Sequence, residues 1–334
     1  MGNVTTHTLL NQKTYDTFDG GRGLSGLCIE LLSEQKKTWQ DLREGCETLK
    51  SIKEREILCK GFSVRLQHNP GRIKSSTADV DEKNRNKRRC FLCLDYLPEG
   101  QKGVLYRSDY LILCNPMPVF SSHFTVSHVD HRRQGIVEHI RIFLQLMTDF
   151  GSFWKILYNG PKCGASAPDH LHFQAVPGGQ MPIEAEIREE KRLTLTKKVD
   201  EVSLYRLRDL GREVILLEGD DPMAVGDVFK HFMEALKQVL SSDEQPMVNV
   251  IGFHSERKLR LLIFPRQKHR PDAFFKEGNA RIVVSPGVID MAGLLITPRE
   301  KDFDRLDGSA VESIYREVSL EGKIMEKAIH ECGG

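Results

Sequence analysis

The chain has 334 residues, of which 48 are Lys or Arg and 47 are Asp or Glu, so its net charge is only +1 at pH 7. This balance argues against a protein whose main task is to bind a nucleic-acid backbone, because such proteins usually carry a strongly basic surface. No window is long and apolar enough to span a bilayer, and the chain contains neither a Gly-x-Gly-x-x-Gly nor a Walker-type loop. We therefore expect a globular protein with a sizeable core, divided into two packed halves.

The N-terminal part is predicted to contain a flexible lead-in and an amphipathic helix. The first two dozen residues are polar and end in a Gly-rich run, which is typical of a flexible segment. Between residues 27 and 58, apolar side chains recur at helical spacing, which predicts one long or broken helix. Residues 62–67 alternate like a strand and end at a Pro-Gly turn.

A charge-rich linker at residues 79–89 leads into a cysteine pair. Its basic end has the composition of a nuclear or nucleic-acid signal, but we interpret it as a solvated loop because it runs directly into Cys90 and Cys93. A two-residue gap lets both sulfurs reach one metal ion, although redox pairs share this spacing. The other six cysteines are scattered singly and no signal-peptide pattern is present, which favours reduced thiols and a cytoplasmic protein.

The middle of the chain combines predicted strands and a helix with an unusual polar motif. Strands are predicted at 105–114, 120–128 and 153–158, and a helix at 135–150. A loop of small residues then leads to His170, His172 and Gln174, whose side chains would share one face of a strand. A neutral imidazole can attack phosphorus and hold a covalent intermediate, and a loop of small residues lets backbone N–H groups approach anionic oxygens. The alternative is a buried histidine pair satisfied by hydrogen bonds, which we consider less consistent with such a loop.

The motif His170-Leu-His172-Phe-Gln174 resembles the active-site segment of the transferase branch of the histidine triad superfamily. That branch includes galactose-1-phosphate uridylyltransferase, the diadenosine tetraphosphate phosphorylases and the GDP-hexose phosphorylases. The segment from His123 to His131 is similar to a strand and turn of these proteins that closes on a histidine. The Cys-x-x-Cys pair at residues 90–93 resembles that of the zinc-containing members, and the three segments follow the order found in the family.

The resemblance implies a role for each matching residue of the motif. His172 would accept the nucleotidyl group, Gln174 would hydrogen-bond its phosphate, and His170 would be structural or a metal ligand. Family members with Gln at the third position are mostly transferases or phosphorylases, whereas those with His there are mostly hydrolases. The loop residues that would contact substrate are Asn159, Gly164, Ala165 and Ser166.

The resemblance also implies a structural zinc ion. Its expected ligands are Cys90, Cys93, His131 and His170, with His123 and His128 as alternatives for the third position. A site with four protein ligands leaves no open position, so the zinc would brace the strand that carries the nucleophile and would not activate water. The alternative is a metal-free knuckle held by hydrogen bonds.

The second half of the chain repeats the pattern of strands and helices more weakly. A charged, helix-compatible stretch is expected at 184–198, a helix at 228–240, and strands at 248–253, 259–264, 282–285 and 294–297. This half contains no His-x-His, so we interpret it as a degenerate copy without catalysis of its own.

Four cationic side chains outside the motif are candidates for binding phosphate. They are Arg65, Arg72, Arg266 and Lys268. Guanidinium groups suit phosphate oxygens geometrically, and a multiply charged leaving group needs cationic partners. Solvated surface turns explain these residues equally well.

The resemblance implies an α+β, histidine-triad-like fold with two tandem copies, in which antiparallel sheets are flanked by helices. We assign residues 1–60 to the lead-in and amphipathic helix, 61–180 to the catalytic half, and 181–334 to the degenerate half that completes the substrate pocket.

The expected function is that of a nucleotidyltransferase or phosphorylase with a covalent nucleotidyl-histidine intermediate. Its donor would be a nucleoside diphosphate sugar or a dinucleoside polyphosphate, and its acceptor would be phosphate or a sugar phosphate. Two alternatives are a nucleotide hydrolase of the same fold and a non-catalytic nucleotide-binding protein. Product analysis separates the first, and a covalent adduct separates the second. We expect no nucleic-acid or membrane partner, and members of the resembled family are often dimers.

Overall fold

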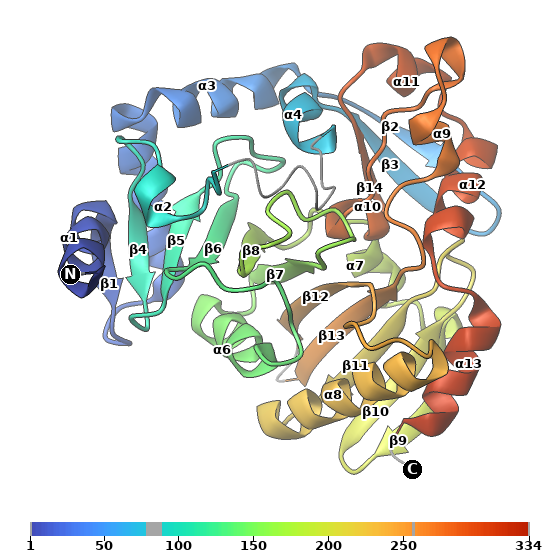
Figure 1. The fold of residues 1–334 in the computed structure, drawn as a ribbon. Coiled ribbons are helices and arrows are strands. Elements are labelled where there is room, and N and C mark those ends of the chain that lie inside the picture. Colours follow the sequence, from blue (N-terminus) through green and yellow to red (C-terminus); the bar gives the residue numbers. More distant parts are fainter. Residues whose placement is uncertain (1, 78–88, 256–257, 333–334) are drawn as a thin grey trace.

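The computed structural model describes residues 2–77, 89–255 and 258–332, so most of the charged linker at 79–89 lies outside the described residues. Eleven strands form one continuous sheet in the order β1-β4-β5-β6-β8-β7-β12-β13-β11-β10-β9 (Figure 1). These strands are β1 (Thr14–Phe18), β4 (Gly103–Tyr106), β5 (Tyr110–Cys114), β6 (Phe124–His128), β7 (Trp154–Asn159), β8 (His172–Pro177), β9 (Leu193–Val199), β10 (Val202–Leu207), β11 (Ile215–Gly219), β12 (Val248–Ser255) and β13 (Lys258–Pro265). A smaller sheet, ordered β14-β3-β2, contains β2 (Lys53–Leu58), β3 (Ser63–His68) and β14 (Leu294–Thr297).

The large sheet consists of two copies of one topology. The first copy has the spatial order β4-β5-β6-β8-β7, with helix α6 (Ile140–Phe150) between its third and fourth strands in the chain. The second copy repeats this arrangement as β9-β10-β11-β13-β12, with α8 (Pro222–Val239) in the corresponding place. The copies join where β7 and β12 pair antiparallel, with Asn159 opposite Asn249. The predicted α+β fold with two tandem copies is therefore confirmed.

The two faces of the large sheet are covered by different layers. Alternate residues of β7 point to opposite faces, so Ile156 belongs to the core beneath the helices α2, α6, α8 and α13, whereas Leu157 belongs to the core beneath the small sheet. Along β8, Phe173 faces the helices, and His172 and Gln174 therefore face the other way. Figure 1 shows α6 and α8 side by side on the helical face.

The remaining helices surround these layers. They are α1 (Gly2–Lys13), α2 (Leu24–Thr38), α3 (Gln40–Thr48), α4 (Ile73–Ser76), α7 (Ile183–Glu186), α9 (Asp272–Phe275), α10 (Val288–Met291), α11 (Glu300–Arg305), α12 (Gly308–Val318) and α13 (Gly322–Glu331). No helix in the described part of the chain is both long and apolar enough to traverse a lipid bilayer.

Several local predictions differ from the structure. The expected helix at 27–58 is broken at Trp39, which has an extended backbone and a buried indole, and the residues from 53 onward form β2 instead. The expected flexible lead-in contributes β1, which pairs in parallel with β4. The stretch at 184–198 was expected to be helical because of its charge, but residues 193–199 form β9 at the sheet edge, where charged side chains can face solvent. Residues 282–285 form no strand.

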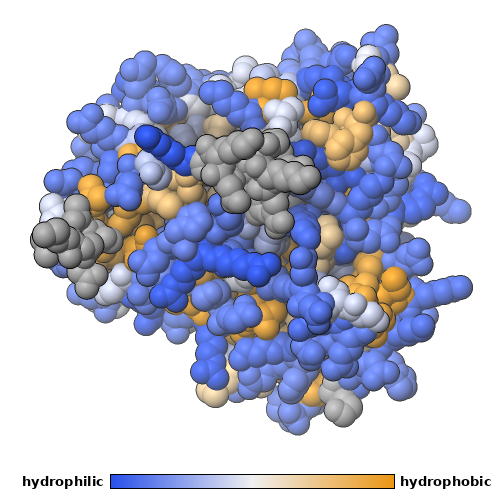
Figure 2. Space-filling model, viewed as in Figure 1, coloured by the Kyte–Doolittle hydropathy of each residue, from blue (hydrophilic) through white to orange (hydrophobic). Residues whose placement is uncertain are grey.

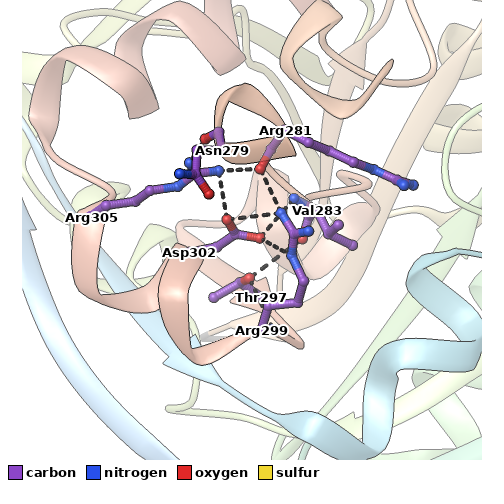
Figure 3. Close-up of polar contacts among 7 residues, drawn as sticks. All are labelled: Asn279, Arg281, Val283, Thr297, Arg299, Asp302 and Arg305. Carbon is purple, nitrogen blue, oxygen red and sulfur yellow. Dashed lines mark hydrogen bonds and ion pairs between the residues drawn. The ribbon is translucent and has the colours of Figure 1, made fainter. Parts of the chain in front are cut away.

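A buried carboxylate fixes the segment that leads from α9 toward β14. Asp302 accepts hydrogen bonds from Arg299 at 2.6 Å, from Arg305 at 2.7 Å and from the backbone N–H of Val283 at 2.9 Å. Both arginines also donate to the carbonyl oxygen of Arg281, so the cluster ties α11 to residues 279–283 (Figure 3). This anchor immediately precedes residues 285–290, which form part of the pocket described below.

The surface view in Figure 2 is mostly hydrophilic, with small separate groups of apolar side chains. This agrees with the 28% of charged residues in the chain.

Candidate active site and metal centre

A pocket of about 420 Å³ lies where the first copy meets the C-terminal part of the chain. Its walls include residues of β5, β6 and β8, the loop before β8, and residues 285–290. The lining side chains with polar or charged groups include Arg72, Lys74, Gln101, Asn115, Thr125, Asn159, Ser166, His172, Gln174, Ser285 and Asp290. The pocket therefore brings together two members of the sequence motif with the cationic segment that follows β3.

His172 opens strand β8 and lines the pocket with only 5% of its surface exposed. Its Nδ1 lies 2.8 Å from the carbonyl oxygen of His170. A carbonyl can only accept, so Nδ1 carries the ring proton and Nε2 keeps its lone pair. Burial lowers the pKa of His172, which keeps the ring neutral. The geometry thus supplies a neutral imidazole with an unprotonated nitrogen.

Gln174 receives a hydrogen bond that decides which way its amide points. The backbone N–H of Val119 donates to His123 Nδ1 at 3.2 Å, so the proton of the neutral ring must lie on Nε2. His123 Nε2 then donates to Gln174 Oε1 at 2.7 Å. Burial, followed by the nearby Arg72, lowers the pKa of His123 to about 4, so the ring is neutral at physiological pH. Gln174 is therefore left with its N–H2 group as a donor at the pocket wall.

The backbone of His172 is fixed by Gln134, which the sequence analysis does not single out. Gln134 Oε1 accepts from His172 N at 2.8 Å, and its Nε2 donates to His172 O at 3.1 Å and to Asn159 O at 2.8 Å. One buried amide thus joins the end of β7 to the start of β8. Nothing in the sequence marks this residue, because a Gln between a loop and a helix is usually exposed.

The loop before β8 packs against the C-terminal part of the chain through two glycines. Gly164 has a φ of +91°, and a Cβ placed on it would lie 2.7 Å from the Cα of Gly287. Neither the backbone conformation nor the space admits a side chain there. Of the predicted loop residues, Asn159, Gly164 and Ser166 line the pocket, whereas Ala165 is buried beneath it.

Of the four cationic candidates, Arg72 lines the pocket, and it donates to Met117 O at 2.8 Å. Arg65 lies outside the lining and bonds the carbonyl oxygen of Gln180. Lys268 pairs with Asp272 outside the pocket. Arg266 is buried, does not line the pocket and donates to acceptors within the protein. Its position therefore does not support the expected contact with a substrate phosphate.

Asp290, which the sequence analysis did not identify, closes the pocket floor. Its two oxygens accept from the backbone N–H groups of Gly287 at 2.9 Å and Ile296 at 2.8 Å. Burial raises its pKa to about 6. We interpret it as the residue that shapes the Gly287 loop, because both of its oxygens are engaged by backbone donors.

The predicted metal ligands gather beside the pocket. Cys90, Cys93, His131 and His170 each place one ligand atom within 4.8 Å of all the others. Cys90 Sγ lies 3.3 Å from His170 Nδ1, and Cys93 Sγ lies 3.1 Å from His131 Nδ1. In a tetrahedral zinc site, with bonds of about 2.0 to 2.3 Å, neighbouring ligand atoms are about 3.5 Å apart. The cluster therefore has the spacing of a site that can bind a metal ion.

The second ring nitrogen of each histidine supports this assignment. His170 Nε2 donates to His128 O at 2.8 Å, which leaves the Nδ1 lone pair directed at the cysteines. His131 Nε2 lies 3.6 Å from the Asp169 carboxylate. Burial, followed by the neighbouring Cys90, raises the pKa of Cys93 to about 12, so ionisation of the Cys93 thiol requires a compensating cation.

The structure corrects one detail of the motif. The sequence predicted that His170 shares a strand face with His172 and Gln174, but β8 begins at His172, and the His170 ring turns to the metal cluster. His128 accepts from Asp130 N at 2.9 Å, and His123 is bound to Gln174, so neither alternative ligand belongs to the cluster.

Two family models match the chain. Residues 31–177 match a domain of unknown function, DUF4922, and residues 186–333 match the model described as GDPGP1-like, C-terminal domain. Among solved structures, yeast Ap4A phosphorylase Apa2 aligns with a TM-score of 0.58 at 12% identity, covering 90% of this chain and 95% of that one. The chain has the fold of this yeast phosphorylase. The same yeast enzyme in complex with Ap4A aligns with a TM-score of 0.53 at 12% identity, over 85% of this chain and 97% of that one. No curated protein sequence matches the chain significantly.

This fold fixes the location of the pocket. Strand β8, which begins at His172, lies next to β7, and β7 forms the junction with β12 of the second copy.

Proposed function

We propose that the chain is a nucleotidyltransferase or phosphorylase in which His172 forms a covalent nucleotidyl intermediate. The observation that carries the proposal is the hydrogen bond from His172 Nδ1 to the His170 carbonyl, which leaves a neutral Nε2 in the pocket. Many buried histidines are structural, but this one combines a fixed tautomer with a pocket that also holds amide donors and cations.

The reaction is a double displacement. Nε2 of His172 attacks the α-phosphorus of the donor, a P–N bond forms, and the P–O bond to the leaving phosphate breaks with its electron pair going to oxygen. The positive charge of the resulting imidazolium is stabilised through Nδ1–H by the His170 carbonyl. In the second step an acceptor phosphate oxygen attacks the same phosphorus, and the electron pair of the P–N bond returns to Nε2. The enzyme is then restored without a net proton change at His172.

The surrounding residues would bind and orient the nucleotide. The Gln174 N–H2 group would donate to a phosphate oxygen, because its oxygen is already occupied by His123. Arg72 and Lys74 would offset the charge of the leaving group. Thr125 and Asn115 add neutral polar groups to the same walls.

The cluster of Cys90, Cys93, His131 and His170 would hold zinc. A closed four-ligand site supplies folding energy and rigidity rather than an activated water. Because His170 provides both a ligand nitrogen and the carbonyl that fixes His172, this site would set the tautomer of the nucleophile.

The substrate class follows from the resemblance and the fold. We propose a nucleoside diphosphate sugar or a dinucleoside polyphosphate as donor, since Ap4A is the compound bound in the yeast relative. Inorganic phosphate as acceptor would make the protein a phosphorylase, and a sugar phosphate would make it a uridylyltransferase-like enzyme.

The test is intact-protein mass after brief incubation with UDP-hexose, GDP-hexose, ADP-hexose and Ap4A, each supplied separately. The expected result is a gain of one nucleoside monophosphate in the wild type and no gain in His172→Ala. The matched control is His231→Ala, which removes an exposed histidine on α8 and should label normally. Equal labelling or full turnover by His172→Ala would exclude the mechanism.

Two product assays separate the alternatives. A hydrolase would release nucleoside monophosphate at the same rate with and without added phosphate. A binding protein would retain nucleotide without any change in mass.

A further inference from the structure

Arg266 is a buried cation whose location does not fit a phosphate ligand. Its guanidinium is 2% exposed and lies at the end of β13. Nε donates to Val318 O at 3.1 Å, Nη1 to Asn249 Oδ1 at 2.6 Å and to Pro286 O at 2.9 Å, and Nη2 to the carbonyl oxygens of residues 268 and 269 at 3.1 and 3.0 Å. All five N–H donors are thereby used within the protein.

The contact with Asn249 has a directional consequence. An arginine can only donate, so the Asn249 atom facing it must be the amide oxygen. The Asn249 N–H2 group must then point away, and it donates to Asn159 Oδ1 at 2.7 Å and to Cys163 O at 2.7 Å. Because Arg266 has only donors, it fixes which end of the Asn249 amide is oxygen and which is nitrogen.

Asn159 is oriented by two donors in the same way. Its Oδ1 accepts from Asn249 and also from the backbone N–H of Val288 at 2.7 Å. Within residues 2–77, 89–255 and 258–332, nothing accepts a hydrogen bond from Asn159 Nδ2, and Asn159 lines the pocket. Its N–H2 group is therefore available to a bound molecule.

We propose that Arg266 and Asn249 are positioning residues that hold the amide N–H2 of Asn159 toward a phosphate oxygen of the nucleotide at His172. The inference rests on the proposed function, and it assigns to the second copy a role in phosphate recognition. A flipped Asn159 would direct its oxygen lone pairs at an anionic phosphate, which exchanges a charge-assisted hydrogen bond for repulsion.

The cost of burying Arg266 supports this role. Burial lowers the pKa of Arg266, and among the described residues no carboxylate accepts a hydrogen bond from it. A neutral glutamine in its place could present either amide atom to Asn249 and would fix no direction. The permanent donor character of arginine fixes the orientation of Asn249, and Asn249 together with the backbone N–H of Val288 orients Asn159.

The decisive variant is Asn249→Asp, which keeps the shape of the side chain and gives Arg266 a carboxylate partner. The new oxygen also faces the carbonyl oxygen of Cys163, so a purely structural role predicts a lower melting temperature but a wild-type rate in the folded protein. We call the chain of hydrogen bonds from Arg266 through Asn249 to Asn159 the relay. The relay predicts that the new oxygen at residue 249 repels Asn159 Oδ1 and turns the Asn159 amide, so that Oδ1 faces the pocket.

The measurements are the single-turnover rate of adduct formation with the donor that labels the wild type, and the affinity for AMP, GMP and UMP by calorimetry. We expect Asn249→Asp to lower the rate and the affinity for the nucleotide that binds by about tenfold to a hundredfold, measured at a temperature where the variant is fully folded. Asn279→Asp, which makes the same change at an exposed position, should leave both unchanged.

A double-mutant cycle identifies the path. Asn159→Ala should show a loss of similar size, and adding Asn249→Asp to it should change the rate by less than about twofold, because the relay no longer has an end. Full additivity, or a wild-type rate in Asn249→Asp, would overturn the proposal.

The proposed function and the relay fail in different ways. If no donor labels the wild type, the covalent mechanism fails, and the calorimetric comparison still tests the relay. If the wild type labels and Asn249→Asp labels equally fast, the relay fails and the mechanism stands.

Discussion

The two copies share one topology but differ at the strand that carries the chemistry. In the first copy, residues 160–171 separate β7 from β8, and His172 and Gln174 face a pocket. In the second copy, only residues 256–257 separate β12 from β13, and the corresponding face carries Leu262 and Phe264 in the apolar core. The two copies of one topology therefore differ by a long loop and two polar side chains, and these are the features on which the proposed activity depends.

The second copy has become a scaffold for the first. Its strand β12 supplies Asn249, and the segment after β13 leads to Gly287 and Val288 at the pocket. Where the first copy leaves space for a ligand, the second fills the equivalent face with α10 to α12. The pocket is thus built from the first copy, the segments that precede it and the segment that follows the second copy.

The largest expected effect concerns the metal cluster, which has no counterpart in the second copy among the described residues. Cys90→Ala should abolish metal binding and lower the free energy of unfolding by about 5 kcal/mol, because the cluster ties the cysteine knuckle to the start of β8. Metal analysis of the purified protein and urea denaturation measure both. Cys332→Ala, which removes a buried thiol far from the cluster, is the control and should retain the metal. Retention of metal by Cys90→Ala would show that the metal is not bound at this cluster.

A smaller effect is expected at the second polar position of the catalytic strand. Gln174→Glu keeps the acceptor for His123 but replaces the N–H2 group by an oxygen that repels phosphate. The rate of adduct formation should fall about 100-fold, equivalent to about 3 kcal/mol, with little change in melting temperature. Stopped reactions followed by mass spectrometry give the rate. A variant that labels at the wild-type rate would show that Gln174 does not contact the phosphate.

Protonation of His123 in the first copy should make the free energy of unfolding depend on pH. The pKa of His123 is lowered to about 4 by burial, so its contribution to stability is complete above its ordinary pKa of about 6.5 and is lost as the pH falls toward 4. Between pH 7 and pH 5 the free energy of unfolding should fall by about 2 kcal/mol from this group. Urea denaturation at both pH values should give a smaller decrease for His123→Gln than for the wild type. An identical decrease would assign the dependence to other groups.

The smallest effect is expected on the second copy. Arg260 on β13 pairs with Glu218 at 2.6 Å away from the pocket, and Glu218 keeps a second partner in Lys258 at 2.8 Å. Arg260→Gln should lower the free energy of unfolding by less than about 1 kcal/mol and leave the labelling rate unchanged. Thermal denaturation and the mass assay together check this. A large loss of activity would mean that the outer strands of the second copy influence the pocket.

The sequence was sufficient for the features that depend on local spacing. The spacing of the Cys-x-x-Cys pair marked two possible metal ligands, the resemblance to the zinc-containing family members added His131 and His170, and the structure brings all four together. Alternation around His172 predicted a strand with a polar face. The tandem organisation was also confirmed, since hydrophobic periodicity reports whole elements well.

Features that depend on partners distant in the chain could not be predicted. Arg266 looked like a phosphate ligand because its neighbours are cationic, and only the tertiary structure shows its donors bound inside. Gln134 and Asp290 act on backbone groups far away in sequence, which leaves no local pattern. The sequence predicts a helix over residues that form strand β9, because charged residues fit an exposed helix and an edge strand equally well.

The contact between Gly164 and Gly287 has a consequence for biosynthesis. During translation the residues of the first copy leave the ribosome well before Gly287 and Val288. The loop before β8 then lacks the backbone against which it packs, and Asn159 lacks one of its two donors. A nascent or prematurely terminated chain would therefore carry the nucleophile without a finished phosphate site. Nucleotide chemistry would begin only when synthesis has passed the second glycine.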